Sequence, residues 1–316
     1  MSAVAIAIAF AVALLLTAAP HYIPLHRAAP VTAATVWLLA LLVRASIVVG
    51  VATLVFARLA HTDLLEAALN WCWHELLPDI PGWLGLAEHP VAHAAVAVPV
   101  FMIAAAVLSH AISGLRAWLA LRRQLSYGSR QDVALVQGDD IVVAVTRFGR
   151  GRVVVSNRAL ELMDDEELAA GMAHEFAHLR RRHRPVLLLA SALSTIGGLL
   201  PGTGIAYREL RFHLERDADA WVVNRLHDPL SLASAICKVA GAMEPRGTAS
   251  LAGRGPVTRR LAELLGERGV RSTRVELAAR ALAMALAAVL LALAIAAPTW
   301  ASALGHASAG HICSHD

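Results

Sequence analysis

The chain has 316 residues, 57% of them hydrophobic and 16% charged, and its mean hydropathy of +0.58 excludes a wholly water-soluble protein. The net charge is +4 and the pI is near 9.4, because arginines are gathered in one segment of the chain. Such an uneven distribution is typical of a membrane protein whose basic segment faces the cytoplasm. We therefore expect no direct binding of nucleic acid.

Four stretches are long and apolar enough to cross a membrane, which takes about 20 residues for about 30 Å of hydrocarbon. In chain order they are residues 2–19, 31–57, 91–121 and 275–298. The first lacks the positive start of a cleaved signal peptide and its apolar run is long for one, so we expect it to remain as a span. The sequence therefore predicts a membrane α-helical protein with four transmembrane helices.

The distribution of basic residues predicts the orientation. Of the 28 Lys and Arg residues, 25 lie between Arg116 and Arg280, whereas the loop 61–90 has none. The positive-inside rule then places the arginine-rich segment in the cytoplasm and both termini outside a plasma membrane. The expected domains are a three-helix region 1–121, a cytoplasmic domain 122–274, the fourth helix 275–298 and an outer tail 299–316.

Cysteines are few, and two of them share the predicted outer face. A disulfide between Cys72 and Cys313 can form there, whereas Cys237 falls in the reducing cytoplasm. Two interpretations stay open, a bonded pair or two free thiols, because the sequence does not give their separation.

The cytoplasmic segment opens with strands and continues with helices, which predicts an α+β domain. Val- and Ile-rich runs on both sides of a glycine-containing break predict an antiparallel hairpin over 141–156, which could offer an edge strand to an extended substrate or serve structural pairing alone. Asp164 then begins a helix with Glu167 at its third position, a capping box, and this helix is expected to reach Arg182.

That helix carries the sequence HEFAH. His174 and His178 are four residues apart and project from one helical face, so both imidazoles can bind one ion. Glu175 can then reach a water molecule held by that ion. Such a motif is short enough to occur by chance on a basic surface helix, so it needs support from elsewhere in the chain.

The stretch ERDAD, on a second helix expected over 207–224, supplies that support. A catalytic zinc site needs a third protein ligand and an open position, and Glu215 offers the carboxylate. Asp219, one turn later, can accept the remaining N–H of a ligand histidine. These acids could instead balance nearby arginines, but both motifs in this order favour a Zn²⁺ site.

The stretch from Val153 to His183 resembles the core of membrane zinc metallopeptidases of two related families. One contains the HtpX and CAAX-prenyl proteases, and the other contains the antibiotic-sensor transducers of the BlaR/MecR type. LERDAD is similar to the ExxAD element of the first family, and PVTRRLAELL resembles its P-x-x-x-R-x-x-x-L element. The resemblance implies a gluzincin-type domain with Zn²⁺ on His174, His178 and Glu215.

Two departures qualify this resemblance. HtpX-like enzymes place membrane helices between the two motifs, whereas residues 185–206 are too few for two complete crossings, so we expect one helix buried in the domain or lying on the inner membrane surface. The antibiotic sensors carry a penicillin-binding domain after the fourth span. Here Pro298–Asp316 follows it, so we expect no direct acylation by β-lactams.

The leading hypothesis is an integral membrane endopeptidase that cuts a cytoplasmic protein, such as a transcriptional repressor or itself, in regulated signalling. Glu175 would be the general base. The sequence does not choose an oxyanion donor among His183, Tyr207, His213 and Arg216. Self-cleavage, which the transducer resemblance implies, is expected within 246–256. The alternatives are an HtpX-like quality-control protease and a non-catalytic receptor with a structural metal.

Two basic features are left without an assigned role. Arg44 lies in the middle of the second span, where a charge is costly and often functional, although a helix break or a side chain reaching the interface explains it as well. The basic run 180–184 could rest on anionic lipid headgroups or form an ordinary solvated helix end.

Overall fold

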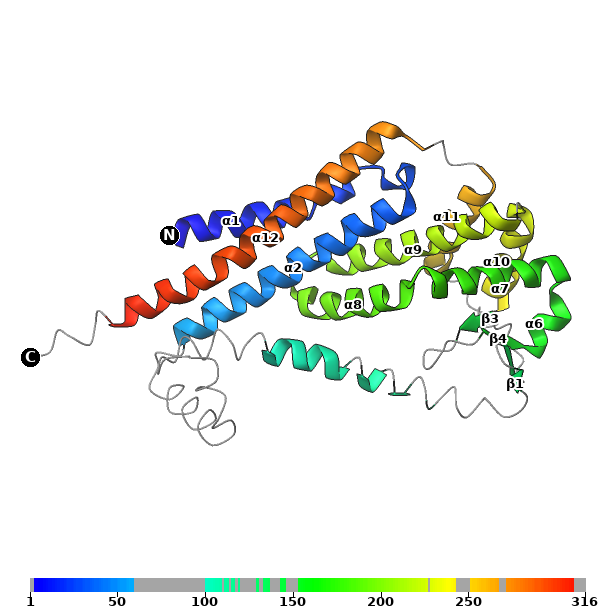
Figure 1. Cartoon of the computed structure of the whole chain (residues 1–316), viewed down its shortest axis with the longest axis horizontal. Helices are drawn as coiled ribbons and strands as arrows, with labels where there is room; N and C mark the ends of the chain where they lie inside the picture. The colour runs from blue at the N-terminus through cyan, green and yellow to red at the C-terminus, as the bar shows by residue number, and fades with distance from the viewer. Residues whose placement is uncertain are drawn as a thin grey trace, which may run out of the picture.

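The computed structural model describes most of the chain, with gaps (Figure 1). The described residues are 3–59, 100–109, 111–113, 115–116, 119, 129–130, 133–136, 143–145, 153–226, 228–242, 251–266 and 271–309. The predicted outer loop 61–90, part of the predicted span 91–121 and both Cys72 and Cys313 lie outside them. The third span and the disulfide therefore stay predictions.

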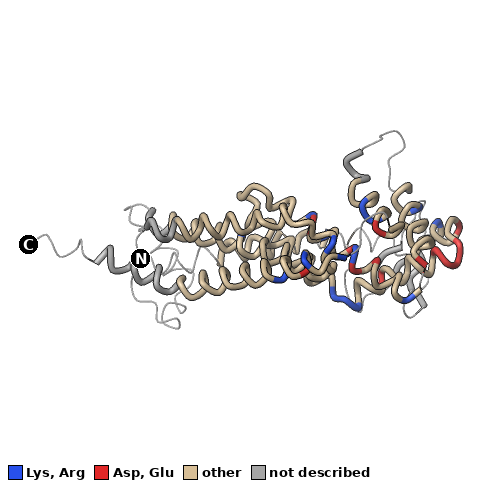
Figure 2. Tube along the Cα trace, turned by 90° about the horizontal axis from the view of Figure 1, so that it is seen from above, with Lys and Arg blue, Asp and Glu red and all other residues tan. Residues whose placement is uncertain are grey.

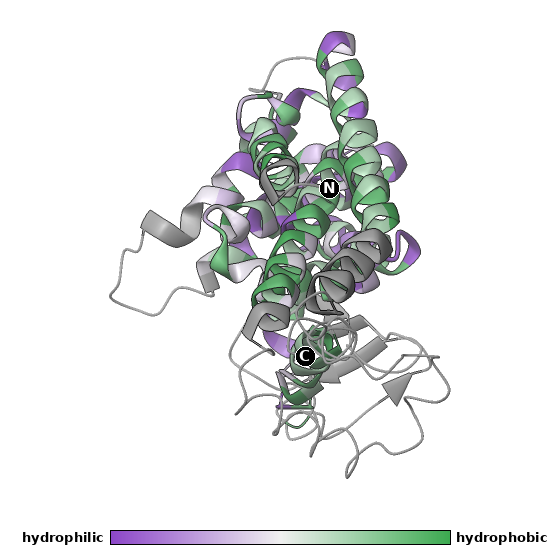
Figure 3. Cartoon of the chain, turned by 90° about the vertical axis from the view of Figure 1, so that its left-hand side faces the viewer, coloured by the Kyte–Doolittle hydropathy of each residue, from purple (hydrophilic) through white to green (hydrophobic). Residues whose placement is uncertain are grey.

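Apolar helices form a bundle at the end of the molecule where both termini lie (Figures 1 and 3). The members are α1 (Ala3–Leu16), α2 (Pro30–Leu59), α8 (His183–Ile196), the N-terminal half of α9 (Thr203–Leu226) and α12 (Thr273–Ala309). They share one hydrophobic core, in which Ala40, Ala190 and Ala206 are fully buried. Small side chains let helix backbones approach closely, which is how helices associate in lipid.

Two of these helices are long and apolar enough to cross a membrane, over Pro30–Val55 in α2 and Thr273–Ala296 in α12. The first predicted span is a helix of only 14 residues, α1. The described part of residues 100–113 is helical and apolar but also short. Two of the four predicted spans thus have the expected length, and the full count of four stays a prediction.

The helices α2 and α12 begin at the same end of the bundle. The carboxylate of Glu276 accepts hydrogen bonds from the backbone N–H of Ala29 at 2.8 Å and from the hydroxyl of Thr32 at 2.7 Å. It thereby satisfies N–H and O–H groups that the start of α2 leaves without an intrahelical partner. The two helices run in the same direction, as a topology with both starting in the cytoplasm requires.

A small sheet and a capped helix open the second half of the molecule. Strands β1 (Ser129–Arg130), β2 (Val133–Val136), β4 (Val153–Ser156) and β3 (Val143–Val145) lie side by side in that order. The antiparallel pairing of β3 with β4 confirms the predicted hairpin. Helix α6 (Asn157–Leu162) follows β4, and the predicted capping box of Asp164 and Glu167 starts α7 (Asp165–Arg180).

The chain between the two motifs differs from the single helix expected there. Arg182, with a left-handed φ of 54°, ends the α7 segment, and α8 starts at once. After the short turn η3 (Gly197–Leu199) the chain returns along α9, which begins at Thr203 and not at Tyr207. The result is a helical hairpin, whose turn contains Gly197, Gly198 and Pro201 and which packs on α2, an element far away in the sequence.

Two further helices complete this second half of the molecule. Helix α10 (Pro229–Ala242) packs on α7, and α11 (Leu251–Leu264) packs on α9 and α10. The part of the predicted 246–256 loop that is described, from Leu251, is helical, with Pro256 inside the helix. Figure 2 shows the charged residues gathered in this half and at its junction with the bundle.

Candidate metal centre

Helix α7 brings the two histidines of HEFAH onto its inner face. His174 is buried and His178 is half-buried, and their rings meet edge to face with centroids 4.8 Å apart. Their Nε2 atoms lie 3.1 Å from each other. Two ring nitrogens at this distance need a proton or a metal ion between them, because two lone pairs would repel.

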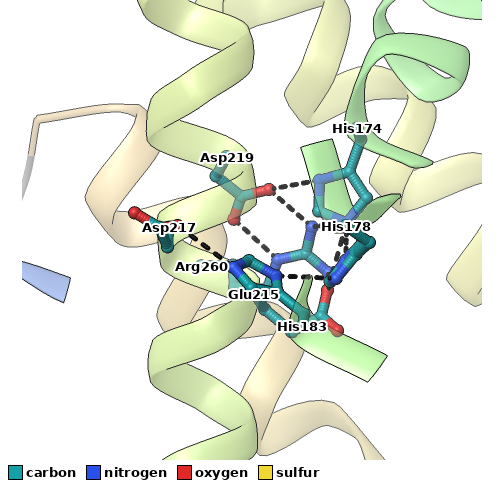
Figure 4. A network of polar contacts seen from close by, with 7 residues as sticks. All are labelled: His174, His178, His183, Glu215, Asp217, Asp219 and Arg260. Atoms are coloured by element: carbon teal, nitrogen blue, oxygen red, sulfur yellow. Dashed lines mark hydrogen bonds and ion pairs between the residues drawn. The ribbon is translucent and has the colours of Figure 1, made fainter. Parts of the chain in front are cut away.

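Helix α9 adds the third donor from the opposite side (Figure 4). Oε2 of Glu215 lies 3.1 Å from Nε2 of His174 and 3.7 Å from Nε2 of His178. Zinc binds nitrogen and oxygen at about 2.0–2.1 Å in a tetrahedron, whose edges are then about 3.3 Å long. The three predicted ligands therefore form a triangle of the size that Zn²⁺ needs.

The charges around His174 show that this place stabilises a cation. Burial lowers the pKa of His174, but contacts with Asp219 and Glu215 outweigh it and raise the pKa to about 9. For the carboxyl group of Glu215, burial raises the pKa, yet the two histidines and Arg260 hold this pKa well below its ordinary value. The donor set thus fits Zn²⁺ in chemistry as well as in spacing.

Asp219, the residue expected to support a ligand histidine, lies against His174. Its Oδ1 lies 3.0 Å from Nδ1 of His174, and a proton on Nδ1 would leave the Nε2 lone pair facing the other two donors. Burial raises the pKa of Asp219, but His174 and Arg260 lower it further, so the carboxylate stays charged.

His178 has a corresponding support that the sequence analysis missed. Its Nδ1 lies 2.9 Å from Nδ1 of His183, and Nε2 of His183 lies 3.1 Å from Oδ2 of Asp217. With its proton on Nε2, His183 would donate to Asp217, and its Nδ1 would accept a proton from Nδ1 of His178. His183 was considered above as an oxyanion donor. In the structure it contacts the predicted ligand His178.

Residues 116–216 match peptidase family M48. The matched segment is about a third of the chain and is similar to the peptidases of this family. Peptidases of family M48 are metallopeptidases that typically use zinc, so the match confirms the predicted resemblance to the zinc metallopeptidases. The matched residues include His174, Glu175, His178 and Glu215 and end before Asp217. No curated protein matches the chain.

Outside the matched segment of the M48 domain, α11 contributes a further charged group. Arg260 donates two hydrogen bonds to Asp219, from Nε at 2.8 Å and from Nη2 at 2.6 Å, and its Nη1 lies 3.2 Å from Oε2 of Glu215. The sequence element P-x-x-x-R-x-x-x-L contains this arginine, but the pattern gave no role for it. In the structure it balances the charge of both carboxylates.

A pocket opens beside these residues and has a volume of about 230 Å³. Glu175 lines it, and burial raises the pKa of this carboxyl although both histidines oppose the change. The apolar wall is formed mainly by α10 and consists of Leu232, Ala235, Ile236, Val239 and Ala240. A peptide could therefore reach the candidate metal site and Glu175 through one opening.

The other proposed oxyanion donors lie elsewhere. His213 is fully buried. Arg216 is bound to Glu263 and to the backbone oxygen of His26, at the junction with the bundle. Tyr207 packs against the bundle core. None of the three is among the described residues that line the pocket, whereas Arg260 is.

Proposed function

We propose that this protein is an integral membrane zinc endopeptidase that hydrolyses peptide bonds of protein substrates on the cytoplasmic side. The observation that carries the proposal is the convergence of three donor atoms, at 3.1 to 3.7 Å from one another, beside Glu175 in the pocket of an M48 domain. A structural metal site has no need of a carboxylate base at this place, which argues against a non-catalytic receptor.

His174, His178 and Glu215 would hold the ion. Bound Zn²⁺ would polarise a peptide carbonyl and lower the pKa of a water molecule to about 7. The protein's own contribution is to keep both imidazoles in one tautomer, through Asp219 for His174 and through His183 for His178. Each histidine then offers its Nε2 to the ion without rearrangement.

Glu175 would move the proton. Its carboxylate would take a proton from the attacking water and pass it to the nitrogen of the leaving amine. The raised pKa favours this task, because a base works best when its pKa lies near the operating pH. The site allows one carboxyl group to serve first as base and then as acid.

Arg260 would stabilise negative charge during the reaction. It lines the pocket and stands between Glu215 and Asp219, so its guanidinium is close to the place where charge develops on the substrate carbonyl. We therefore favour Arg260 over the four residues that the sequence offered for this role.

The proposed topology has four spans, with the M48 domain in the cytoplasm and both termini outside. It is supported by the two long apolar helices, by their common direction and by the placement of the arginines. Within that topology we propose a role in regulated signalling, with a cytoplasmic repressor or the chain itself as substrate. Its support is the resemblance to the sensor transducers.

The test is a comparison of new protein N-termini in cells that make the wild-type chain or Glu175→Gln. Glu166→Gln, an exposed glutamate on the same helix, is the matched control. We expect N-termini that need Glu175 and are indifferent to Glu166, with equal zinc in all three purified proteins. Equal N-termini in all three, with zinc bound, would contradict the proposed activity.

The same map separates regulation from quality control. One defined cut in one protein supports signalling, whereas many cuts in unrelated membrane proteins support the HtpX-like alternative. A cut between residues 246 and 256 of the chain itself would support self-cleavage.

A further inference from the structure

A charged side chain is buried inside one of the two long apolar helices. Arg44 lies in the middle of α2, and only 3% of its surface is exposed. Its Nη1 donates a hydrogen bond to the backbone oxygen of Pro201, in the turn between η3 and α9. A charged side chain within a membrane span is energetically costly and usually has a specific polar partner. The hydrogen bond to Pro201 therefore indicates that Arg44 binds the turn before α9.

The turn of the α8–α9 hairpin fits closely against α2 at this arginine. Gly202 has a left-handed φ of 85°, and a Cβ atom there would lie 3.4 Å from both Nη1 and Nη2 of Arg44. A Cβ atom on Gly197 would lie 3.5 Å from the backbone nitrogen of Ala45. The tip of the hairpin is therefore seated on α2 at the level of Arg44.

The outer surface of this hairpin is apolar. No charged residue occurs from Pro185 to Tyr207. Leu188, Leu189 and Ile205 are 54%, 46% and 43% exposed, and Leu199 at the tip is 85% exposed. The outward residues of α2 and α12 are also apolar and include Val51 and Leu291. In water such a surface would be unfavourable, whereas lipid acyl chains would cover it.

The length of the first arm of the hairpin, α8, is close to the thickness of one leaflet of a bilayer. From Pro185 to Ile196, α8 rises by about 18 Å at about 1.5 Å per residue. The hydrocarbon core is about 30 Å thick, so half of it is about 15 Å. On the returning arm α9, the exposed Arg208 and Arg211 lie about 8 and 12 Å from Thr203, so in a membrane their long side chains would have to extend to the polar interface.

We propose that residues 185–207 form a re-entrant membrane hairpin, which enters and leaves the cytoplasmic leaflet and whose tip is fixed at mid-depth by Arg44. The occupant of its outer face is the acyl-chain region of the lipids. This inference rests on the proposed membrane location of the protein. It replaces the expectation of one helix in the domain or on the membrane surface.

The test is a depth measurement at single cysteines. The three native cysteines are replaced by serine, and one cysteine is introduced at Leu199, Leu291 or Leu230 and labelled with an environment-sensitive fluorophore. Leu291 is the matched control within a span. Ala29 and Glu276 are joined by a hydrogen bond, and Arg44 and Leu291 follow them by the same number of residues, so the two should lie at a similar depth. Leu230, on α10 and 66% exposed, is the control in water.

The full-length protein is placed in phosphatidylcholine–phosphatidylglycerol liposomes, and quenching by aqueous iodide is compared with quenching by lipids that carry a spin label deep in the acyl chain. We expect the labels at Leu199 and Leu291 to be quenched by the lipid and shielded from iodide, and the label at Leu230 to behave oppositely. Iodide access at Leu199 with Leu291 still shielded would overturn the hairpin alone. Iodide access at Leu291 as well would overturn the membrane location too.

Arg44→Gln supplies a second readout in the same protein. Loss of the guanidinium should leave the Pro201 oxygen without its donor, so the label at Leu199 should become several-fold more accessible to iodide while the label at Leu291 is unchanged. An unchanged label at Leu199 would remove Arg44 from its role as anchor. The depth measurement in the protein with Arg44 intact does not depend on how this variant folds.

Discussion

Each of the three proposed ligands has its own supporting residue. Asp219 contacts His174, His183 contacts His178, and Arg260 contacts Glu215. Asp217 extends the second of these chains, since it accepts from His183. Partners of this kind fix the orientation and the basicity of a ligand, so the site is set before an ion arrives.

At the residue scale, Asp219→Asn should weaken zinc binding by about 10- to 100-fold. The amide keeps the shape of the side chain but loses the charge that holds the proton on Nδ1 of His174. Competition with a chelator of known affinity measures the effect, and Asp165→Asn, an exposed acid on α7, serves as control. Equal zinc affinity in Asp219→Asn and the control would show that Asp219 does not support the ligand.

His183→Phe tests the support that the sequence did not reveal. The ring fills similar space but cannot accept the proton from Nδ1 of His178, so we expect a loss of zinc affinity of about tenfold. Asp217→Asn should give a smaller loss, because it acts through His183. A larger loss in Asp217→Asn than in His183→Phe would contradict the proposed order of contacts.

At the scale of elements, α7 is held to α10 by an ion pair that responds to pH. Lys238 and Ser234, both on α10, bind the buried carboxylate of Glu167 and lower its pKa below the ordinary value of 4.5. A carboxyl group whose pKa is lowered by folding stabilises the protein above its unfolded pKa, and this stabilisation is lost as the pH falls through the folded pKa.

Lys238→Met should therefore lower the melting temperature near neutral pH, and the difference from wild type should shrink as the pH falls below about 4.5. Thermal unfolding of the detergent-solubilised protein between pH 7 and pH 3 measures it. Arg158→Met, which removes an exposed ion pair with Glu161, is expected to have little effect at any pH. A Lys238→Met difference that is constant across this range would exclude the ion pair as its source.

Local signals predicted α7, its capping box and the β3–β4 pairing, because each depends on residues close in sequence. The candidate donors His174, His178 and Glu215 could be named for a similar reason, since helical spacing and two short motifs specify them. Arg260 and Asp217 were not assigned, because their roles depend on how α9 and α11 pack. The hairpin was missed because its partner, Arg44, lies far away in the sequence.

At the scale of the whole molecule, the hairpin and the metal site are parts of one unit. Helix α8 starts at His183, which contacts a proposed ligand, and ends at the tip beside α2. Along α9, Glu215 lies about 18 Å from the tip at Thr203. A tip at mid-depth would then place the metal site at the cytoplasmic surface of the membrane, next to the headgroups.

Substrate bonds close to the membrane should consequently be cut faster than distant ones. A cleavable sequence taken from the N-terminus map can be placed after a transmembrane helix, at increasing distance on a rigid helical spacer that adds about 1.5 Å per residue. In liposomes that contain the protein, we expect the cleavage rate to fall steadily as the spacer lengthens. With flexible Gly/Ser spacers of equal length the cleavage rate should fall less, because a flexible spacer lets the scissile bond come back to the membrane surface. Equal rates along the rigid series would show that the site reaches well into the cytoplasm.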